Sequence, residues 1–191
     1  MLYTRKGDGG TTKTFGCDQR VSKSSVIAEA LGTLDEINSF LGLLKVKATG
    51  VYFSFPANPT GISKKTISVR DTIDRIQQDL FIIQAGIAGA EKAVTIDKVK
   101  WLEEIVDGIE KNLEPIKTFF VPGGTELSAL SDVARTIARR AERRVIAVVD
   151  EGKITVNKEN LAYLNRLSSV LYAFVRNFNK TAFVKEETPK Y

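Results

Sequence analysis

Apolar residues recur at the spacing of an α-helix in five segments of this chain. In the first segment, from about Ser22 to Lys47, they fall three and four positions apart and form one stripe, which is the pattern of a helix that buries one face. The other stripes run from Val69 to Ile87, from Leu102 to Leu113, from Leu130 to Val148 and from Leu161 to Phe178. With no convincing strand pattern between them, these segments predict an all-α fold, a five-helix bundle.

Residues with capping preferences lie at the expected ends of these helices. Thr95, Thr125 and Asn157 precede the third, fourth and fifth stripes, and their side chains are of the types that accept hydrogen bonds from the first N–H groups of a helix. Pro115 and Gly152 follow the third and fourth stripes. We therefore expect the third helix to stop before Pro115 and the fourth to stop at Gly152.

The segment 49–61 joins the first two helices and is rich in glycine, proline and aromatic residues. Because glycine and proline interrupt helices, we expect a surface connection here, and we assign no role to residues 49–65. The sequence shows neither an internal repeat nor a change in composition that would indicate a second domain. We expect one domain over residues 1–191, made of an N-terminal glycine-rich loop (1–21), the helical bundle (22–180) and a polar tail (181–191).

The N-terminal segment 4–14 departs from the helical pattern. It contains three glycines, four hydroxyl side chains and three cationic side chains in eleven positions. One interpretation is a mobile chain end; the other is a loop whose backbone N–H groups, hydroxyls and cations hold phosphate oxygens. The segment lacks the spacing G-x-x-x-x-G-K-[ST] of a Walker loop, so it does not separate these interpretations by itself.

Composition narrows the chemistry that is open to this chain. The 191 residues include no histidine and one cysteine, Cys17, which excludes Ser-His and Cys-His nucleophile systems, an intrachain disulfide and a cysteine metal cluster. An enzyme of this composition must work through arginine, lysine, carboxylates, backbone dipoles and Mg²⁺, which are the groups that handle phosphates. The net charge of +5 favours an anionic partner, either a nucleotide or a nucleic acid.

The sequence carries no signal for a membrane. No apolar run approaches the roughly 20 residues of a membrane-spanning helix. The first residues carry charge without a following apolar region, so they do not have the pattern of a signal peptide. We therefore expect a cytoplasmic protein with no membrane partner.

The fourth predicted helix carries an unusual concentration of charge. Its charged residues in this stretch are Arg135, Arg139, Arg140, Glu142, Arg143 and Arg144. Most of them share one face by i, i+3 and i, i+4 spacing. This face is either a solvated basic surface or a clamp for polyphosphate, which the planar guanidinium fork meets in bidentate fashion.

Two further features do not fit a plain bundle. Polar residues lie beside the apolar stripes of the first and fifth helices, where they need hydrogen-bond partners; they are Asp35, Asn38, Ser39, Asn165, Arg166, Ser168 and Ser169. Phe119 and Phe120 stand on the loop that leads into the arginine-rich helix. They form either a hydrophobic lid over the end of the bundle or part of a pocket for a large apolar ligand.

Several short motifs run in order along nearly the whole chain. They are Thr-Arg-x-Gly-Asp-x-Gly-x-Thr at Thr4 to Thr12, Arg-Val-Ser-Lys at Arg20 to Lys23, Ala-x-Gly-x-x-Asp-Glu-x-Asn-Ser at Ala30 to Ser39, Ile-Gln-x-x-Leu-Phe at Ile76 to Phe81, Phe-x-x-Pro-Gly-Gly-Thr at Phe119 to Thr125, Ala-Arg-Thr-x-x-Arg-Arg-Ala-Glu-Arg at Ala134 to Arg143, and Leu-Asn-Arg-Leu-Ser at Leu164 to Ser168. Each is weak alone, and together they are specific. By these motifs the chain resembles the PduO-type ATP:cob(I)alamin adenosyltransferases.

The resemblance implies an enzyme that transfers the 5′-deoxyadenosyl group of ATP to the cobalt of cob(I)alamin, giving adenosylcobalamin and triphosphate. In that reaction the reduced cobalt is the nucleophile, so no protein histidine is needed. ATP and cobalamin are the implied substrates, and Mg²⁺ accompanies ATP. The residues implied to bind ATP are Thr4, Arg5, Lys6, Gly7, Asp8, Thr12, Lys13, Lys23, Arg139, Arg140, Glu142, Arg143 and Asn165.

The resemblance also implies an assembly. Family members are trimers of five-helix bundles with ATP sites between subunits, so we expect a homotrimer in which Asp35 pairs with Arg135 across a subunit boundary. Phe119 matches the aromatic residue that closes the lower face of the corrinoid, excludes the lower axial ligand and makes the cobalt easier to reduce. A reductase and a cobalamin-dependent mutase are further expected partners, and nucleic acid is not.

Two departures from the family pattern affect the corrinoid side. Ser131 stands where the family often has histidine, and Ser169 stands where it usually has aspartate. A binding module that has lost turnover through these changes is therefore one alternative. The main rival is a non-catalytic basic helical bundle that binds nucleic acid or nucleotide through the same arginines, with a steep dependence on salt.

Overall fold

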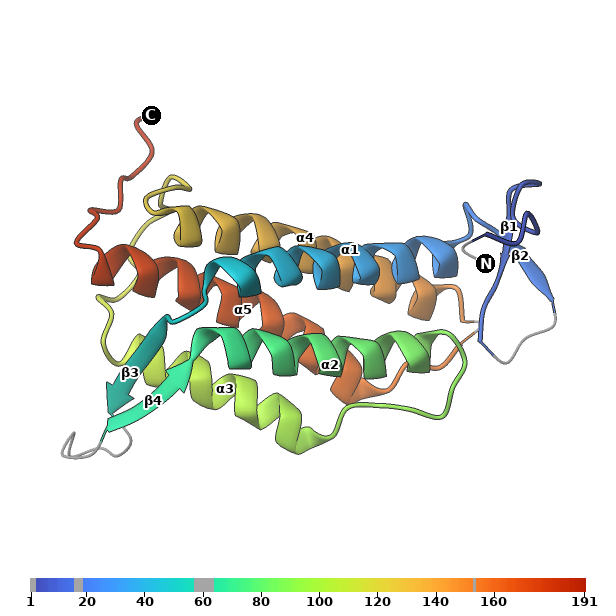
Figure 1. The fold of residues 1–191 in the computed structure, drawn as a ribbon, viewed down its shortest axis with the longest axis horizontal. Coiled ribbons are helices and arrows are strands. Elements are labelled where there is room, and N and C mark those ends of the chain that lie inside the picture. The colour runs from blue at the N-terminus through green and yellow to red at the C-terminus, as the bar shows by residue number, and fades with distance from the viewer. Residues whose placement is uncertain (1–2, 16–18, 57–63, 153) are drawn as a thin grey trace.

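The computed structural model of the chain describes residues 3–15, 19–56, 64–152 and 154–191. Five helices dominate it, as the apolar pattern predicts (Figure 1). They are α1 (Val26–Lys47), α2 (Val69–Ile87), α3 (Ile96–Glu110), α4 (Glu126–Asp150) and α5 (Lys158–Thr181). Cys17 and part of the segment 49–65 lie outside the described residues.

The bundle is held together by the predicted apolar stripes. Helix α4 packs between α1 and α5, α2 packs against α1, and α3 packs against α5. Most stripe positions are buried in one core, and Leu34, Ile73 and Leu171 are fully buried. Burying such side chains contributes about 1.5–3 kcal/mol each. Val133 is an exception, because it is 46% exposed on α4 and does not join the core.

Two of the three predicted helix caps form as expected. The Thr125 hydroxyl accepts a hydrogen bond from the Ser128 N–H at 3.0 Å, and the Asn157 side chain accepts one from the Glu159 N–H at 2.7 Å. Thr95 has the extended backbone of a cap, but its side chain accepts no capping hydrogen bond from the described residues. Helix α3 ends at Glu110, a few residues before Pro115, so Leu113 packs against the core from outside the helix.

The all-α five-helix bundle is confirmed, and two short strand pairs that the sequence pattern did not reveal add to it. Strands β1 (Thr11–Lys13) and β2 (Arg20–Ser22) pair antiparallel beside the start of α1, and β3 (Tyr52–Pro56) pairs antiparallel with β4 (Lys64–Ser68) beside its end (Figure 1). The β3–β4 pair lies in the segment that we expected to be a plain connection. Its alternation of buried and exposed residues spans only a few positions. The glycine and proline residues around it indicate a loop, so this short strand pattern was not recognised in the sequence.

The β3–β4 pair is anchored by two phenylalanines. Phe53 and Phe55 are 2% and 4% exposed, and they alternate with exposed residues as a two-residue period requires. The Phe53 ring meets the Phe174 ring edge to face, with 5.3 Å between centroids. The Phe55 ring lies over Gly108, where an added Cβ would come within 2.4 Å of it. The strands therefore extend the core of the bundle.

A buried polar cluster joins α2, α3 and α5 in the same core. Asp79 is fully buried, and it accepts hydrogen bonds from the Tyr163 hydroxyl at 3.0 Å and from the Lys98 ammonium. Burial, and then the neighbouring Asp79 carboxylate, raise the pKa of Tyr163 well above its ordinary value. The Tyr163 hydroxyl therefore stays neutral and acts as a hydrogen-bond donor over the whole physiological range.

Candidate functional site

A cavity of about 570 Å³ opens at the end of the bundle where α4 begins and α5 ends. Its volume lies in the range of small-molecule sites. The loop before α4, the exposed turns of α4 and α5, and the C-terminal tail form its walls, and the lining includes Phe119, Phe120, Val121, Asp132, Arg135, Arg139, Ser169, Tyr172, Val175 and Glu186. The Phe119 side chain is 78% exposed, so one aromatic face is available to a ligand.

The polar wall of this cavity comes from α4. Arg135 and Arg139 lie one turn apart and both line it. The Arg135 Nε contacts an Asp132 carboxylate oxygen at 2.7 Å, and its guanidinium lies 5.7 Å from the centre of the Tyr172 ring. Burial raises the pKa of Tyr172. The cavity therefore combines neutral aromatic surface with a fixed cation and with the exposed Arg139.

Within one chain Arg135 does not pair with Asp35. Arg135 is held by Asp132 of its own helix, three residues earlier. Asp35 is exposed on α1, and none of the described residues is its ion-pair partner. Pairing of Asp35 with Arg135 across a subunit boundary stays a prediction.

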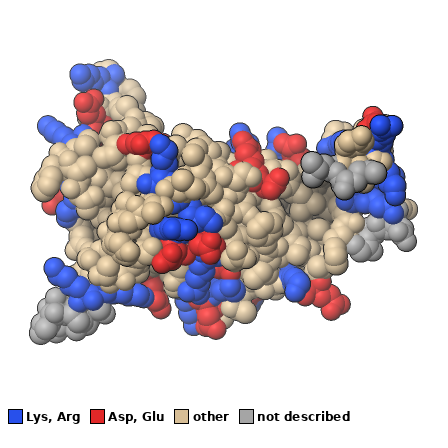
Figure 2. Space-filling model, in the orientation of Figure 1, with Lys and Arg blue, Asp and Glu red and all other residues tan. Residues whose placement is uncertain are grey.

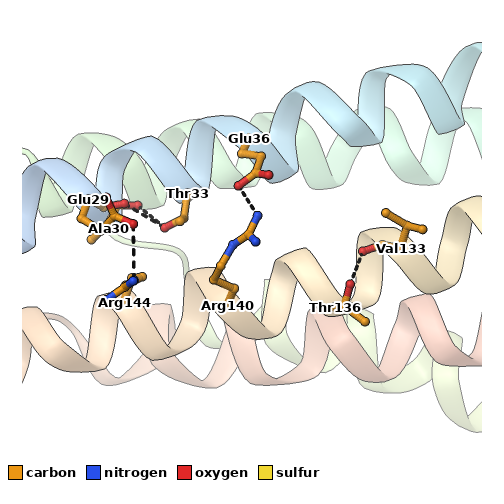
Figure 3. Close-up of polar contacts among 8 residues, drawn as sticks. All are labelled: Glu29, Ala30, Thr33, Glu36, Val133, Thr136, Arg140 and Arg144. Carbon is orange, nitrogen blue, oxygen red and sulfur yellow. Dashed lines mark hydrogen bonds and ion pairs between the residues drawn. The ribbon is translucent and has the colours of Figure 1, made fainter.

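Helix α1 holds two other arginines of α4 (Figure 3). Arg140 forms an ion pair with Glu36, and the Arg144 Nε lies 3.5 Å from a Glu29 carboxylate oxygen. Both arginines extend from α4 toward α1 in this view. Arg140, which we expected in an ATP site, is thus already engaged by a carboxylate. Arg139 and Arg143 remain exposed, and the Arg143 guanidinium donates to the Arg139 carbonyl at 3.1 Å.

The structure brings together two more of the predicted site residues. The Asn165 amide of α5 donates to Glu142 of α4 at 2.8 Å. The Asn165 carbonyl oxygen in turn accepts from Arg166 at 2.8 Å, and the Arg166 Nε contacts Glu103 at 2.9 Å. This chain of contacts crosses α4, α5 and α3. Arg166, held by Glu103, fixes the orientation of the Asn165 amide. The sequence alone did not indicate this role for Arg166 and Glu103.

The N-terminal segment is folded back on itself. Lys23 lies over Gly7, because a Cβ added to Gly7 would be 3.1 Å from the Lys23 Nζ. Backbone hydrogen bonds from the Asp8 N–H to the Arg5 carbonyl and from the Lys23 N–H to the Gly10 carbonyl close the turns. The predicted ATP residues of segment 4–13 and the distant Lys23 therefore share one loop.

Arg20 organises this loop, and its role was missed in the sequence. Its Nε donates to the Thr11 hydroxyl at 2.7 Å, and its Nη2 donates to the carbonyls of Thr11 and Lys6. The only signal in the sequence was the place of Arg20 in the motif that ends at Lys23. Arg5 has a φ of 60°, a conformation that residues other than glycine rarely adopt, so the loop backbone is held in an unusual turn.

The loop and the cavity lie far apart in one chain. Strands β1 and β2 lie at one end of the bundle, and the segment between α3 and α4 lies at the other (Figure 1). Figure 2 shows Lys and Arg atoms gathered at the β1–β2 end, while acidic and basic atoms intermingle over the helices. Helix α4 has 25 residues, and it spans roughly 37 Å at 1.5 Å per residue. One chain therefore does not bring its own loop to its own cavity.

The two serines at the departures from the family pattern have different surroundings. Ser169 is exposed and lines the cavity, and its place on the corrinoid side stays a prediction. Ser131 is fully buried, and its hydroxyl donates to the Leu127 carbonyl at 2.7 Å. Ser131 is not among the residues that line the cavity, and its hydroxyl is satisfied inside its own helix; its place on the corrinoid side stays a prediction.

The described residues offer no preformed protein cage for a metal ion. Among the residues that the structure describes, no three histidine, cysteine, aspartate or glutamate side chains come together in a way that could hold one. In the same part of the chain, none of the helices combines the length and apolar character of a membrane span.

Comparisons with known proteins identify the relatives of this chain. The sequence matches the family described as Cobalamin adenosyltransferase over residues 2–178. It is 33% identical over 201 residues to the corrinoid adenosyltransferase PduO of Salmonella typhimurium, which covers 100% of this chain and 54% of that protein. It is also 33% identical over 178 residues to the corrinoid adenosyltransferase of Bacillus subtilis, covering 93% of this chain and 86% of that protein. The chain thus spans about half the length of the PduO protein.

Solved structures give the same picture. A variant of the PduO-type ATP:corrinoid adenosyltransferase from Lactobacillus reuteri, complexed with cobalamin and ATP, matches with a TM-score of 0.83 and 28% identity over 100% of both chains. A second variant of that protein, complexed with ATP, matches with a TM-score of 0.82 and 28% identity over 99% of this chain and 100% of the other. The match therefore extends over the whole bundle.

Proposed function

Because the chain belongs to the cobalamin adenosyltransferase family, we propose that it transfers the 5′-deoxyadenosyl group of ATP to the cobalt of cob(I)alamin. Two electrons of cob(I) form the new bond between cobalt and the 5′-carbon of ATP. The bond from that carbon to the triphosphate oxygen breaks, and its electron pair leaves with triphosphate. The products are adenosylcobalamin and triphosphate, and no protein nucleophile is required, which suits a chain without histidine.

The observation that carries this proposal is the shared cavity of Phe119 and two arginines. A corrinoid is a large, largely apolar disc, and the aromatic wall formed by Phe119, Phe120 and Tyr172 offers it a complementary surface. Phe119 would close its lower face. Arg135 and Arg139 line the same cavity and would supply the cations that the leaving triphosphate needs.

The exposed arginines of α4 would stabilise the leaving group. Negative charge builds on the triphosphate as the bond to the 5′-carbon breaks, and preorganised cations at that place lower the barrier. Arg139 and Arg143 are exposed and face no carboxylate among the described residues, which leaves their guanidinium forks open to phosphate oxygens. Glu142 and Asn165 would hold the nucleotide beside them, and Arg140 would join the site by releasing Glu36.

The N-terminal loop would hold the triphosphate from the other side. Lys23 above Gly7, with Arg5, Lys6 and Lys13 in the same segment, gathers cations next to backbone N–H groups. Thr4, Asp8 and Thr12 supply the hydroxyl and carboxylate groups of this segment. Because the loop and the cavity lie at opposite ends of one chain, a loop from a neighbouring copy best completes the site. This supports a homotrimer with shared ATP sites and an Asp35–Arg135 pair between subunits.

Mg²⁺ would enter with the nucleotide. Magnesium is usually bound through substrate phosphates, water and one or two carboxylates, and that mode does not need the cluster of protein ligands that is missing among the described residues. Bound there, Mg²⁺ would neutralise part of the triphosphate charge. A reductase that supplies cob(I)alamin and a mutase that receives the product are the expected partners, and the cytoplasm is the expected compartment.

Nucleic-acid binding is the weaker alternative. Its electrostatic footprint would be a continuous stripe of unpaired cations, whereas Glu36 and Glu29 neutralise two of the arginines of α4. The aromatic cavity would also have no task.

A direct assay separates these possibilities. The purified chain is mixed with ATP, Mg²⁺ and chemically reduced cobalamin, and the absorption change from cob(I)alamin to adenosylcobalamin is followed against a protein-free control. We expect turnover that saturates in both substrates. A rate equal to the protein-free control would refute the enzymatic proposal, and binding of both substrates without product would indicate a binding module.

A further inference from the structure

The last turns of α5 contain buried polar residues beside the apolar stripe of the helix. Arg176 is 6% exposed, Asn177 is 8% exposed and Asn179 is 5% exposed. Buried charges are rare in proteins unless they are paired and hydrogen-bonded. The contacts of these side chains therefore show what this end of the helix is built to hold.

Arg176 holds three separate parts of the chain. Its Nε lies 3.1 Å from a carboxylate oxygen of Glu186 in the C-terminal tail. Its Nη1 donates to the Glu114 carbonyl at 2.9 Å, at the start of the segment between α3 and α4. Its guanidinium also lies 5.3 Å from the centre of the Phe120 ring. One side chain thus ties the tail to the start and to the middle of the segment that carries Phe119.

The tail and the Phe119 loop are also joined through their backbones. The Val121 N–H donates to the Glu187 carbonyl at 2.8 Å. Glu186, Phe119 and Val121 all line the cavity. The tail is therefore one wall of the proposed corrinoid site, and the Phe119 loop is the wall beside it.

Asn179 fixes the far end of the same loop. Its side chain accepts from the Thr125 N–H at 3.4 Å and donates to the Gly123 carbonyl at 3.3 Å. Gly124 lies so close that an added Cβ would be 2.2 Å from the Asn179 oxygen, and its φ of +111° suits glycine. With this end anchored to α5, the position of Phe119 depends on what holds the middle of the loop, and that is Arg176 with the tail.

We propose that Arg176 and Glu186 form a lock that positions the Phe119 loop, and that Arg176 is a positioning residue for the corrinoid. The inference rests on the proposed function, because it names the part of that site on which Arg176 acts. Both side chains of the pair are nearly buried, at 7% and 18% exposed. Removing one partner of such a pair leaves an uncompensated charge. If Glu186 lost its charge, the C-terminal tail would detach so that water could reach the unpaired Arg176 guanidinium. The Phe119 loop would then be released from the tail.

The test compares two neighbouring glutamates. Glu186→Gln removes the charge that pairs with Arg176. Glu187→Gln is the matched control, because Glu187 is exposed and contributes its backbone carbonyl to the contact. For Glu186→Gln we expect the KM for cob(I)alamin to rise about tenfold or more, while the KM for ATP changes less than about twofold. For Glu187→Gln we expect both KM values to match the wild type.

A second measurement reports on the lock without turnover. Hydrogen exchange at the Val121 amide should become faster in Glu186→Gln and stay unchanged in Glu187→Gln, because that amide bonds to the tail. An unchanged corrinoid KM or an unchanged Val121 exchange rate in Glu186→Gln would overturn the inference, and so would an equal rise in both KM values. If the wild type makes no adenosylcobalamin, the proposed function fails, and the exchange rate still decides whether the lock exists.

Discussion

Replacement of Arg20 by methionine tests whether the N-terminal loop is held ready for ATP. The Arg20 guanidinium makes hydrogen bonds to the Thr11 hydroxyl, the Thr11 carbonyl and the Lys6 carbonyl, and so links both halves of the loop. Methionine keeps the length of the side chain and removes all of these donors. The change therefore weakens the closed form of the loop without substituting any of the residues that we propose to bind ATP.

The magnitude follows from these contacts. Arg20 is exposed, so each hydrogen bond is taken near the low end of the usual range, which gives about 2 kcal/mol for the set. A loss of about 2 kcal/mol in loop closure lowers the fraction of molecules with a closed loop by up to about 30-fold, and the apparent Kd for ATP rises by the same factor. The apparent Kd of Arg20→Lys for ATP should lie between the values for the wild type and for Arg20→Met, because an ammonium group cannot reproduce the guanidinium fork.

The assay is calorimetric titration with ATP and Mg²⁺, accompanied by thermal unfolding. We expect the unfolding midpoint of Arg20→Met to stay close to the wild-type value, because Arg20 lies outside the core. Arg70→Met is the matched control, since Arg70 is an exposed arginine in the first turn of α2. A wild-type Kd for ATP in Arg20→Met would refute the reasoning that the closed loop binds the nucleotide.

Three further predictions concern the cavity and the core. Arg139→Ala should lower kcat about 10²–10³-fold, because the developing triphosphate charge loses a preorganised partner; a near-normal rate would remove Arg139 from the site. Phe119→Ala should slow the reaction that starts from cob(II)alamin and a reductant more than the reaction of prereduced cob(I)alamin, and equal slowing of both would exclude a lower-face role. The pKa of Tyr163 is raised in the folded state, so its contribution to stability is complete below the unfolded-state value of about 10 and is lost as the pH rises above it. Tyr163→Phe should therefore flatten the fall in unfolding free energy above about pH 10 and cost about 1–3 kcal/mol near neutrality; an unchanged alkaline slope would contradict this.

The helices were the predictable part of this protein, and the reason is physical. A 3.6-residue period repeated over many turns is a strong signal, so residues such as Leu34, Ile73 and Leu171 fell in the core as predicted. Phe53 and Phe55 gave a two-residue period over a short strand, which is too brief to stand out beside Gly50 and Pro56. Local pattern therefore identified long elements and missed short ones.

The candidate site was predictable in its residue types and less so in its geometry. Arg139 and Phe119 were singled out before the structure placed both on one cavity. The contacts of Arg20 and Arg176 depend on residues far along the chain or on backbone carbonyls, which carry no side-chain signature. Ser131 shows the same limit, because nothing in its neighbours indicated that its hydroxyl bonds back to its own helix.

The leaving group is the most direct test of adenosyl transfer. Phosphorus NMR during the reaction with ATP, Mg²⁺ and cob(I)alamin measures which phosphate species is released, while the absorption spectrum measures the cobalt product. Attack at the 5′-carbon predicts one equivalent of triphosphate for each equivalent of adenosylcobalamin. Release of ADP and phosphate, or triphosphate without a cobalt–carbon product, would contradict the account.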